Sequence, residues 1–208
     1  MNQLLIELQY FPPICYFSLI QGFDRLYVEK YEHYQKQTYR NRCYIQSARG
    51  REILIVPLVH GTGKTVIRDI RIDYGQKWLN NHWRAIQSAY GKAPFFEHYQ
   101  QELHDTLFRR NAFLYDLNHD ILMLCIRLLR HNIQVLETTS YEADAGAGIK
   151  DFRSVLNPKR PESCQGIYKP VEYPQVFGNR FAENLSIIDV LFCEGPASLA
   201  VVRTSAIK

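Results

Sequence analysis

Long apolar runs, closely spaced cysteines and an export-type N-terminus are all missing from this chain of 208 residues. No stretch of about 18 apolar residues occurs, so we expect no membrane-spanning helix. The N-terminus has no basic flank leading into an apolar run that ends in small residues, which argues against a signal peptide. Because an odd number of widely spaced cysteines does not form a disulfide framework, we expect a cytoplasmic protein with reduced thiols. The five cysteines are Cys15, Cys43, Cys125, Cys164 and Cys193.

Patterns for binding metals and nucleic acids are missing as well. Histidine and acidic residues occur without His-Glu-x-x-His or similar spacing, so we predict no metal site. The charge is nearly balanced, with 25 basic and 21 acidic residues and a formal net charge of +4. A nucleic-acid-binding protein usually carries a denser basic stripe, and we expect no nucleic-acid partner. No motif identifies a cofactor.

The segment Gly61-Thr-Gly-Lys-Thr65 matches a phosphate-binding P-loop only in part. The full motif needs a glycine at the position where this chain has Leu58, and it needs a helix directly afterwards. Residues 66–72 alternate like a strand instead. We therefore interpret the glycines as a turn in a hairpin and reject a P-loop.

Aromatic residues are plentiful, with 14 tyrosines and 11 phenylalanines. Apolar residues make up 46% of the chain and charged residues 22%, which is enough for a globular core. Tyrosine combines apolar area with a polar tip. The tyrosines therefore fit the wall of a polar ligand pocket, although an aromatic core is the simpler explanation.

The most informative segment is an elbow near the N-terminus, Gln9-Tyr-Phe-Pro-Pro13. Residues 4–8 have the composition of a buried strand, which the two prolines would end because proline lacks an N–H and fixes φ. The same prolines suit the first turn of a helix over 14–22, and a second strand is expected over 25–29. This is the start of a βαβ unit. Elbows at the carboxyl end of a first strand are favoured positions for anions and nucleotides.

The whole chain is predicted to form a single α/β or α+β domain, with a short mixed Rossmann-like sheet and an added helical layer. Residues 1–75 are mainly strand-rich, 76–132 are helical, and 133–208 combine a strand, a long loop and a closing helix. Further strands are expected over 43–46, 53–57, 65–72 and 133–138, the first two as a hairpin. Helices are expected over 76–90, 94–110, 117–132, 151–156 and 186–192, and loops over 143–148 and 157–174.

Polar side chains of the elbow are the first group of candidate site residues. Gln9, Tyr10 and Tyr16 offer hydrogen-bond donors and acceptors to a substrate. Cys15, near the expected helix N-terminus, is a candidate catalytic nucleophile, although an inert buried cysteine is commoner. The elbow is laid out like that of nucleotidyltransferases with an H-x-x-H motif. No histidine occupies it, so that catalytic comparison fails.

The second group of candidates follows the expected second strand and should emerge at the same edge of the sheet. Its cations suit a phosphate or carboxylate, because arginine offers a planar fork to such oxygens. His33 is the candidate general base, and Asn41 would orient the substrate. A solvated loop is the alternative explanation of the same charges. The candidate substrate-binding residues here are Lys36, Thr38, Tyr39, Arg40, Asn41 and Arg42.

Four segments carry a family resemblance. They are the elbow, the run Tyr34-Gln-Lys-Gln-Thr-Tyr-Arg-Asn-Arg-Cys43, the segment Trp83-Arg-Ala-Ile-Gln-Ser-Ala-Tyr-Gly-Lys-Ala-Pro-Phe-Phe96 and the run Asn184-Leu-Ser-Ile-Ile-Asp-Val-Leu-Phe-Cys-Glu-Gly-Pro196. In this order, over nearly the whole chain, they resemble the WbqC-like protein family. That family is named after bacterial surface-polysaccharide (O-antigen) gene clusters. The resemblance implies a cytoplasmic bacterial protein with a role in sugar modification or acyl-type transfer.

Two functional hypotheses follow. The first is an enzyme of sugar or surface-polysaccharide precursor biosynthesis that transfers an acyl or aminoacyl group to a nucleotide-linked sugar. Its small-molecule substrate would be anionic, a nucleotide sugar or an acyl donor, held by residues 36–42. The alternative is a non-catalytic binding or scaffold protein whose aromatic elbow holds a peptide or protein partner. A cavity with converging polar groups would favour the enzyme, and a flat aromatic patch would favour the binding protein.

Overall fold

The computed structural model describes residues 2–59, 64–177 and 180–207 and confirms the predicted α/β class. One sheet has four parallel strands in the order β5-β2-β1-β6. Two further strands pair antiparallel as a separate hairpin, so parallel and antiparallel pairs do not share one mixed sheet. The parallel strands are β1 (Gln3–Glu7), β2 (Arg25–Glu29), β5 (Gln134–Glu137) and β6 (Ile149–Asp151), and the hairpin strands are β3 (Arg42–Ser47) and β4 (Gly50–Ile55).

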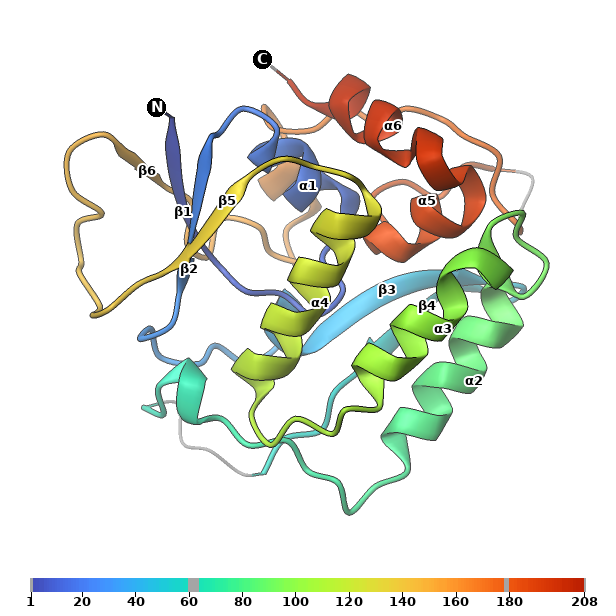
Figure 1. The fold of residues 1–208 in the computed structure, drawn as a ribbon, viewed down its shortest axis with the longest axis horizontal. Helices are drawn as coiled ribbons and strands as arrows, with labels where there is room; N and C mark the ends of the chain where they lie inside the picture. Colours follow the sequence, from blue (N-terminus) through green and yellow to red (C-terminus); the bar gives the residue numbers. More distant parts are fainter. Residues whose placement is uncertain (1, 60–63, 178–179, 208) are drawn as a thin grey trace.

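The predicted βαβ unit at the start of the chain is confirmed. β1 and β2 pair in parallel, from Gln3 opposite Arg25 to Glu7 opposite Glu29. Between them lies α1 (Ile14–Ile20), in which every residue is buried. A helix that is apolar on all sides is stable only when neighbours cover it. α5 (Ile187–Glu194) and α6 (Ser198–Ser205), from the far end of the chain, provide that cover (Figure 1).

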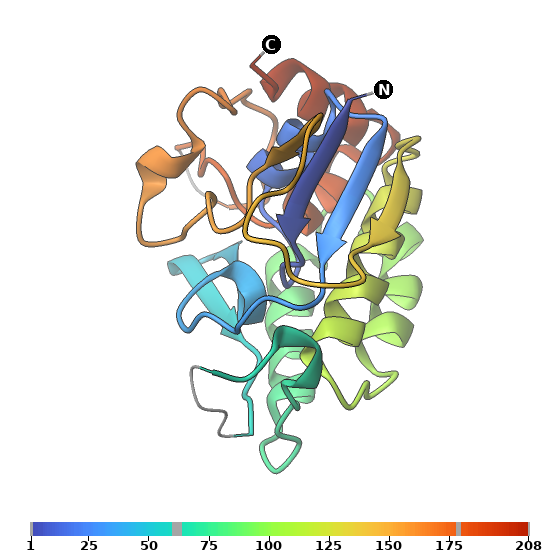
Figure 2. The ribbon, with the colours of Figure 1, turned by 90° about the vertical axis from the view of Figure 1, so that its left-hand side faces the viewer.

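Three longer helices form the predicted helical layer. In Figure 2 the four parallel strands point the same way, with helices behind them and the β3–β4 hairpin beyond their carboxyl ends. Each of the three helices has its apolar residues at three- and four-residue steps, which gives one face to bury. They are α2 (Trp78–Tyr90), α3 (Phe96–Leu107) and α4 (Leu114–Leu128).

The end of α5 needs a glycine. Gly195 has a φ of +51°, and a Cβ there would lie 2.4 Å from the Phe95 ring. α5 ends at Glu194, close to the expected end at residue 192. The chain nevertheless continues through a short 3₁₀ turn into α6, so the prediction that residues 186–192 form the last helix is wrong.

Two other element predictions are also wrong. Residues 65–72 form no strand, but a short 3₁₀ helix (Ile67–Asp69) flanked by isolated bridges to other segments. Residues 151–156 form no helix, because Ile149–Asp151 pairs with β1 as the edge strand β6. The glycine-rich turn expected over 61–63 lies outside the described residues.

Candidate functional site

A cleft of about 550 Å³ lies at the carboxyl edge of the parallel sheet. The chain builds outward from β1 through β2 to β5, and then returns to place β6 on the other side of β1. Ligands of parallel α/β sheets favour the point where the strand order reverses. We call this cavity the carboxyl-edge cleft. It is lined by Tyr31, Glu32, His33, Tyr34 and Gln35 after β2, by Tyr141 and Ala143, and by Asp151, Arg153 and Ser154 at β6.

Arg40 is the centre of a buried ion network beside this cleft. Its Nε and Nη2 atoms donate to the two carboxylate oxygens of Glu32, each at 2.6 Å. Glu7, the last residue of β1, approaches the same guanidinium at 3.8 Å. Ser154 hydrogen-bonds to both Glu7 and Arg40, since its backbone N–H donates to the Glu7 carboxylate at 2.7 Å and its Oγ accepts from Arg40 at 3.0 Å. Arg40 is only 1% exposed, so its guanidinium holds carboxylates and does not face the solvent.

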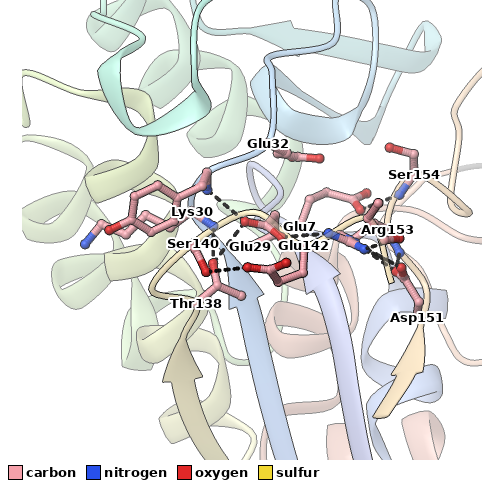
Figure 3. Close-up of polar contacts among 12 residues, drawn as sticks. Glu7, Glu29, Lys30, Glu32, Thr138, Ser140, Glu142, Asp151, Arg153 and Ser154 are labelled. Atoms are coloured by element: carbon pink, nitrogen blue, oxygen red, sulfur yellow. Dashed lines mark hydrogen bonds and ion pairs between the residues drawn. The ribbon is translucent and has the colours of Figure 1, made fainter. Parts of the chain in front are cut away.

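Arg153 forms a second ion network next to the first (Figure 3). Its Nη1 donates to Glu29 at the end of β2 at 2.9 Å, and its Nη2 donates to Asp151 at the end of β6 at 2.6 Å. Glu29 also accepts from the Thr138 hydroxyl, just after β5, at 2.9 Å. All four parallel strands therefore contribute to the polar groups at this edge, because their carboxyl ends lie side by side.

Negative charge is in excess in these networks, with four carboxylates facing two guanidiniums. Burial raises the pKa of Glu32 against the opposing effect of Arg40. Hydrogen bonds to Asp151 raise the pKa of Arg153, which keeps its guanidinium charged. Buried ion clusters add little to stability compared with apolar packing, and they gather at functional sites.

In the described part of the chain, no three His, Cys, Asp or Glu side chains are grouped as a metal site.

A second groove, of about 260 Å³, shares the lining residue Tyr34 with the carboxyl-edge cleft. Lys36 and Arg42 give it two cationic side chains, and Asn41 lies in its wall. Within the described ranges neither cation forms an ion pair, and Arg42 Nε has no hydrogen-bond partner. A cation that no carboxylate neutralises is available to an anion. We call this cavity the cationic groove.

His33 lies at the exposed rim of the carboxyl-edge cleft. Its backbone forms an isolated bridge with Val66, which holds the rim segment while the imidazole stays open to solvent. Aromatic rings complete the walls. Tyr31 and Tyr141 line the cleft, and the Arg153 guanidinium lies 4.9 Å from the centre of the Tyr141 ring.

The elbow is inside the core and not at the surface. Gln9, Tyr10 and Tyr16 are at most 1% exposed, and they line neither cavity. Gln9 Nε2 donates to the Glu7 carboxylate at 2.8 Å, and the Tyr10 hydroxyl lies 2.9 Å from His82 Nδ1. Through the hydrogen bond from Gln9 to Glu7, the buried elbow therefore supports the ion network of Arg40. It presents no exposed aromatic patch of the kind that the binding-protein hypothesis needs.

The remaining candidates from the sequence are also buried. Burial raises the pKa of Cys15 well above its ordinary value, which keeps that thiol protonated. Asn41 Nδ2 donates to the Val56 carbonyl at 3.0 Å, and burial likewise raises the pKa of Tyr39. The structure thus brings His33, Lys36, Asn41 and Arg42 to the walls of the two cavities. The other candidates are buried and line neither cavity: Gln9, Tyr10, Cys15, Tyr16, Thr38, Tyr39 and Arg40.

Sequence reasoning missed the acidic half of the site. Glu7 and Glu29 are the last residues of two apolar strands, and their position at strand ends was a usable signal. Parallel neighbours bring such residues to one edge. Glu32 is the third residue after β2 and offered a similar signal. Asp151 and Arg153 could not be placed, because β6 was not recognised as a strand.

Comparison with known proteins decides the family. The sequence profile of the WbqC-like protein family matches residues 9–156 and 165–201. The chain belongs to the WbqC-like protein family. Both cavities fall inside these matched segments, and of the two ion networks only Glu7 lies outside them.

One relative is a protein of Mycobacterium tuberculosis described as "Uncharacterized protein Rv1507c". It is 33% identical over 93 residues, which are 44% of this chain and 40% of that protein, so the similarity spans less than half of the relative's length. No solved structure matches the chain significantly. The helices formed by the described residues all fall short of the length and apolar character that a bilayer span requires.

Proposed function

We propose that this WbqC-like protein transfers an acyl or similar group to a nucleotide-linked sugar during surface-polysaccharide precursor biosynthesis. The sugar would lie in the carboxyl-edge cleft and the phosphates in the cationic groove. The observation behind the proposal is that Tyr34 lines both cavities, of which one lies beside buried acid–arginine networks and the other is lined by cations. Family membership supports the biological setting, because the family is named after O-antigen gene clusters.

The chemistry of the carboxyl-edge cleft suits a sugar. Sugar hydroxyls both donate and accept hydrogen bonds, and the cleft offers carboxylate acceptors beside guanidinium and hydroxyl donors. Asp151 and Arg153 line it next to Ser154. Tyr31 and Tyr141 add aromatic area for the apolar face of a sugar ring. A volume of about 550 Å³ is within the usual range for small-molecule sites.

The cationic groove would hold the anionic part of the donor. Arg42 offers a planar fork to phosphate oxygens, and Lys36 adds a flexible point charge. Asn41 is less suited to a direct contact, because its Nδ2 is already bonded to the Val56 carbonyl. The proposed anion contacts are therefore Lys36 and Arg42.

His33 is the proposed general base at the rim. In acyl transfer, a sugar hydroxyl or amine attacks the acyl carbon, loses its proton, and the donor's leaving group departs. An imidazole within reach of the attacking group can accept that proton. We assign Arg40 a positioning role instead of a substrate contact, because it is buried and holds Glu32 and Glu7. It thereby fixes the segment that carries both His33 and the cationic groove.

A thermal-shift screen tests the proposal. The purified protein is screened against nucleotides, nucleotide sugars and acyl-coenzyme A compounds. A ligand at 100 times its dissociation constant adds about 2.7 kcal/mol to the free energy of unfolding. For a chain of this size we expect a rise in melting temperature of roughly 5–10 °C. The rise should be largest for nucleotide sugars and should be lost in Arg42→Ala.

The matched control is Arg49→Ala, which removes the same charge from an exposed turn between β3 and β4. It should leave the ligand-induced rise unchanged. If a nucleotide sugar stabilised the wild type and Arg42→Ala equally, the assignment of the phosphates to the cationic groove would be wrong. A screen without any response from nucleotide sugars would contradict the proposed substrate class.

A further inference from the structure

Two cysteines far apart in the sequence meet beside a third cavity. Cys15 is the second residue of α1, and Cys164 ends a 3₁₀ helix (Pro161–Cys164) in the long irregular segment. Their Sγ atoms lie 3.0 Å apart. A disulfide bond is about 2.05 Å long, so the sulfurs need to approach by only roughly 1 Å to bond. Sequence patterns could not indicate this pair, because 149 positions separate its members.

Asn184 hydrogen-bonds to both cysteines. Its side-chain oxygen accepts the Cys15 backbone N–H at 3.0 Å, which directs its amide nitrogen to Cys164 Sγ at 3.2 Å. Asn184 has a φ of +51°, an uncommon conformation for a residue other than glycine. Its own N–H lies 3.4 Å from the Tyr168 hydroxyl. A donor aimed at one sulfur stabilises the thiolate form of that sulfur.

The cavity gives one of the two thiols access to solvent. It has a volume of about 330 Å³, and we call it the thiol cleft. Cys164 lines it and is 7% exposed, whereas Cys15 is fully buried behind it. A small oxidant therefore reaches Cys164 first. The lining includes Tyr39, Arg51, Cys164, Tyr168, Glu183 and Asn184.

We propose that Cys164 and Cys15 form a redox-active pair that a small peroxide entering the thiol cleft oxidises to a disulfide. Cys164 thiolate attacks one peroxide oxygen, the O–O bond breaks, and the leaving hydroxide takes up a proton to become water. Cys15 sulfur then attacks the sulfenic sulfur of Cys164, and the S–S bond forms as a second water leaves with the Cys15 proton. Two electrons pass from the thiols to the peroxide, and an external dithiol reverses the step by exchange.

The order of attack follows from the two environments. The hydrogen bond between the two thiols lowers the pKa of Cys164, and the Asn184 amide acts in the same direction. Burial raises the pKa of Cys15, which makes it the resolving thiol. Cys164 lies between the two segments that match the family. The thiol cleft shares no lining residue with the carboxyl-edge cleft or the cationic groove, so this proposal is independent of the proposed sugar chemistry.

Peroxide treatment of the wild-type chain tests the pair. The fully reduced protein is exposed to a few equivalents of hydrogen peroxide, and its remaining thiols are alkylated before peptide mapping. We expect a mass loss of about 2 Da and a Cys15–Cys164 cross-linked peptide. Cys193 is the internal control, because it is 6% exposed but has a pKa raised by burial to about 12. Before oxidation, Cys164 should be alkylated at least about tenfold faster than Cys193.

Two variants separate the roles of the thiols. In Cys15→Ser, the sulfenic acid of Cys164 should persist and be captured by a 1,3-diketone reagent. In Cys193→Ser, the yield of the Cys15–Cys164 disulfide should be unchanged. The proposal is overturned if treated wild-type protein yields no such peptide, or if Cys193 is oxidised as fast as Cys164. Both decisive readouts use the wild-type chain and do not depend on the folding of a variant.

Discussion

The two edges of the parallel sheet carry cavities of opposite character. The amino edge has the larger one, about 1030 Å³, but its charged side chains Asp24, Lys150 and Arg203 are exposed. The carboxyl-edge cleft, of about 550 Å³, lies against networks in which Glu7 and Arg40 are each 1% exposed. Burying charge costs stability, so a cluster kept despite that cost indicates a role beyond folding. Volume alone would favour the amino edge, whereas the buried charge favours the carboxyl edge.

Removing the central cation of the carboxyl edge should have the largest effect on stability. Arg40→Ala leaves the carboxylates of Glu32 and Glu7 buried without their partner. We expect a loss of about 3–5 kcal/mol in the free energy of unfolding, measured by urea denaturation. Arg203→Ala at the amino edge is the control, with an expected change of less than about 0.5 kcal/mol. Equal effects of the two substitutions would abolish the contrast between the edges.

The pH dependence of stability should also come from the carboxyl side. Burial beneath the elbow lowers the pKa of His82 from 6.5 to about 4 in the folded protein. Between pH 6.5 and 4, His82 is therefore protonated in the unfolded chain and neutral in the folded chain. The free energy of unfolding that is present above pH 6.5 is lost as the pH falls towards 4. The loss amounts to about 3 kcal/mol. His82→Gln should flatten the curve of unfolding free energy against pH over this window.

His131 at the amino edge provides the comparison for that measurement. Burial and the nearby Arg203 lower the pKa of His131 as well, so its contribution has the same sign. It is more exposed than His82, and His131→Gln should flatten the curve less. If His131→Gln removed more of the pH dependence than His82→Gln, the assignment to the carboxyl side would be wrong.

The sequence predicted the parts of the fold that depend on local patterns. β1, α1 and β2 are apolar runs separated by proline and glycine, and the helices α2, α3 and α4 have clear periodicity. β6 was missed because its three residues, Ile149–Asp151, become a strand only by pairing with β1, far away in the chain. Residues 65–72 alternate like a strand but find no continuous partner. Pairing over long distances in sequence is what local patterns do not contain.

The candidate site was predicted in part for the same reason. The sequence identified residues 33–42 as a cationic segment, and Lys36 and Arg42 do lie in a groove. It could not show that Glu32, eight residues earlier, binds Nε and Nη2 of Arg40 with its two carboxylate oxygens. Nor could it show that the elbow is buried, because an aromatic run of this composition suits a core as well as a pocket wall.

A double substitution separates stability from function at the carboxyl edge. Arg40→Met combined with Glu32→Leu replaces the Glu32–Arg40 ion pair by apolar groups of similar size. We expect the double variant to be about 2 kcal/mol more stable than the sum of the two single effects predicts. Urea denaturation of all four proteins measures this coupling. Nucleotide-sugar binding should remain impaired, because the ordered Glu32–Arg40 contact beside the cleft is gone. Full recovery of binding would show that the network has only a structural role.

The smallest effect is expected at the amino edge. Lys150→Ala removes an exposed cation whose closest described aromatic contact is the Phe23 ring, 5.8 Å from Nζ to the ring centre. Stability should change by less than about 0.5 kcal/mol, and the melting-temperature rise caused by a nucleotide sugar should stay the same. A marked loss of that rise would indicate that the nucleotide sugar binds in the larger cavity at the amino edge.

Hydrogen–deuterium exchange with and without the best-binding nucleotide sugar tests the central claim most directly, because it locates the ligand without any substitution. We predict slower exchange in residues 31–42 and 151–154, which form the carboxyl-edge cleft and the cationic groove. Slower exchange confined to residues 131–132 and 203–207, which line the amino-edge cavity, would contradict the account.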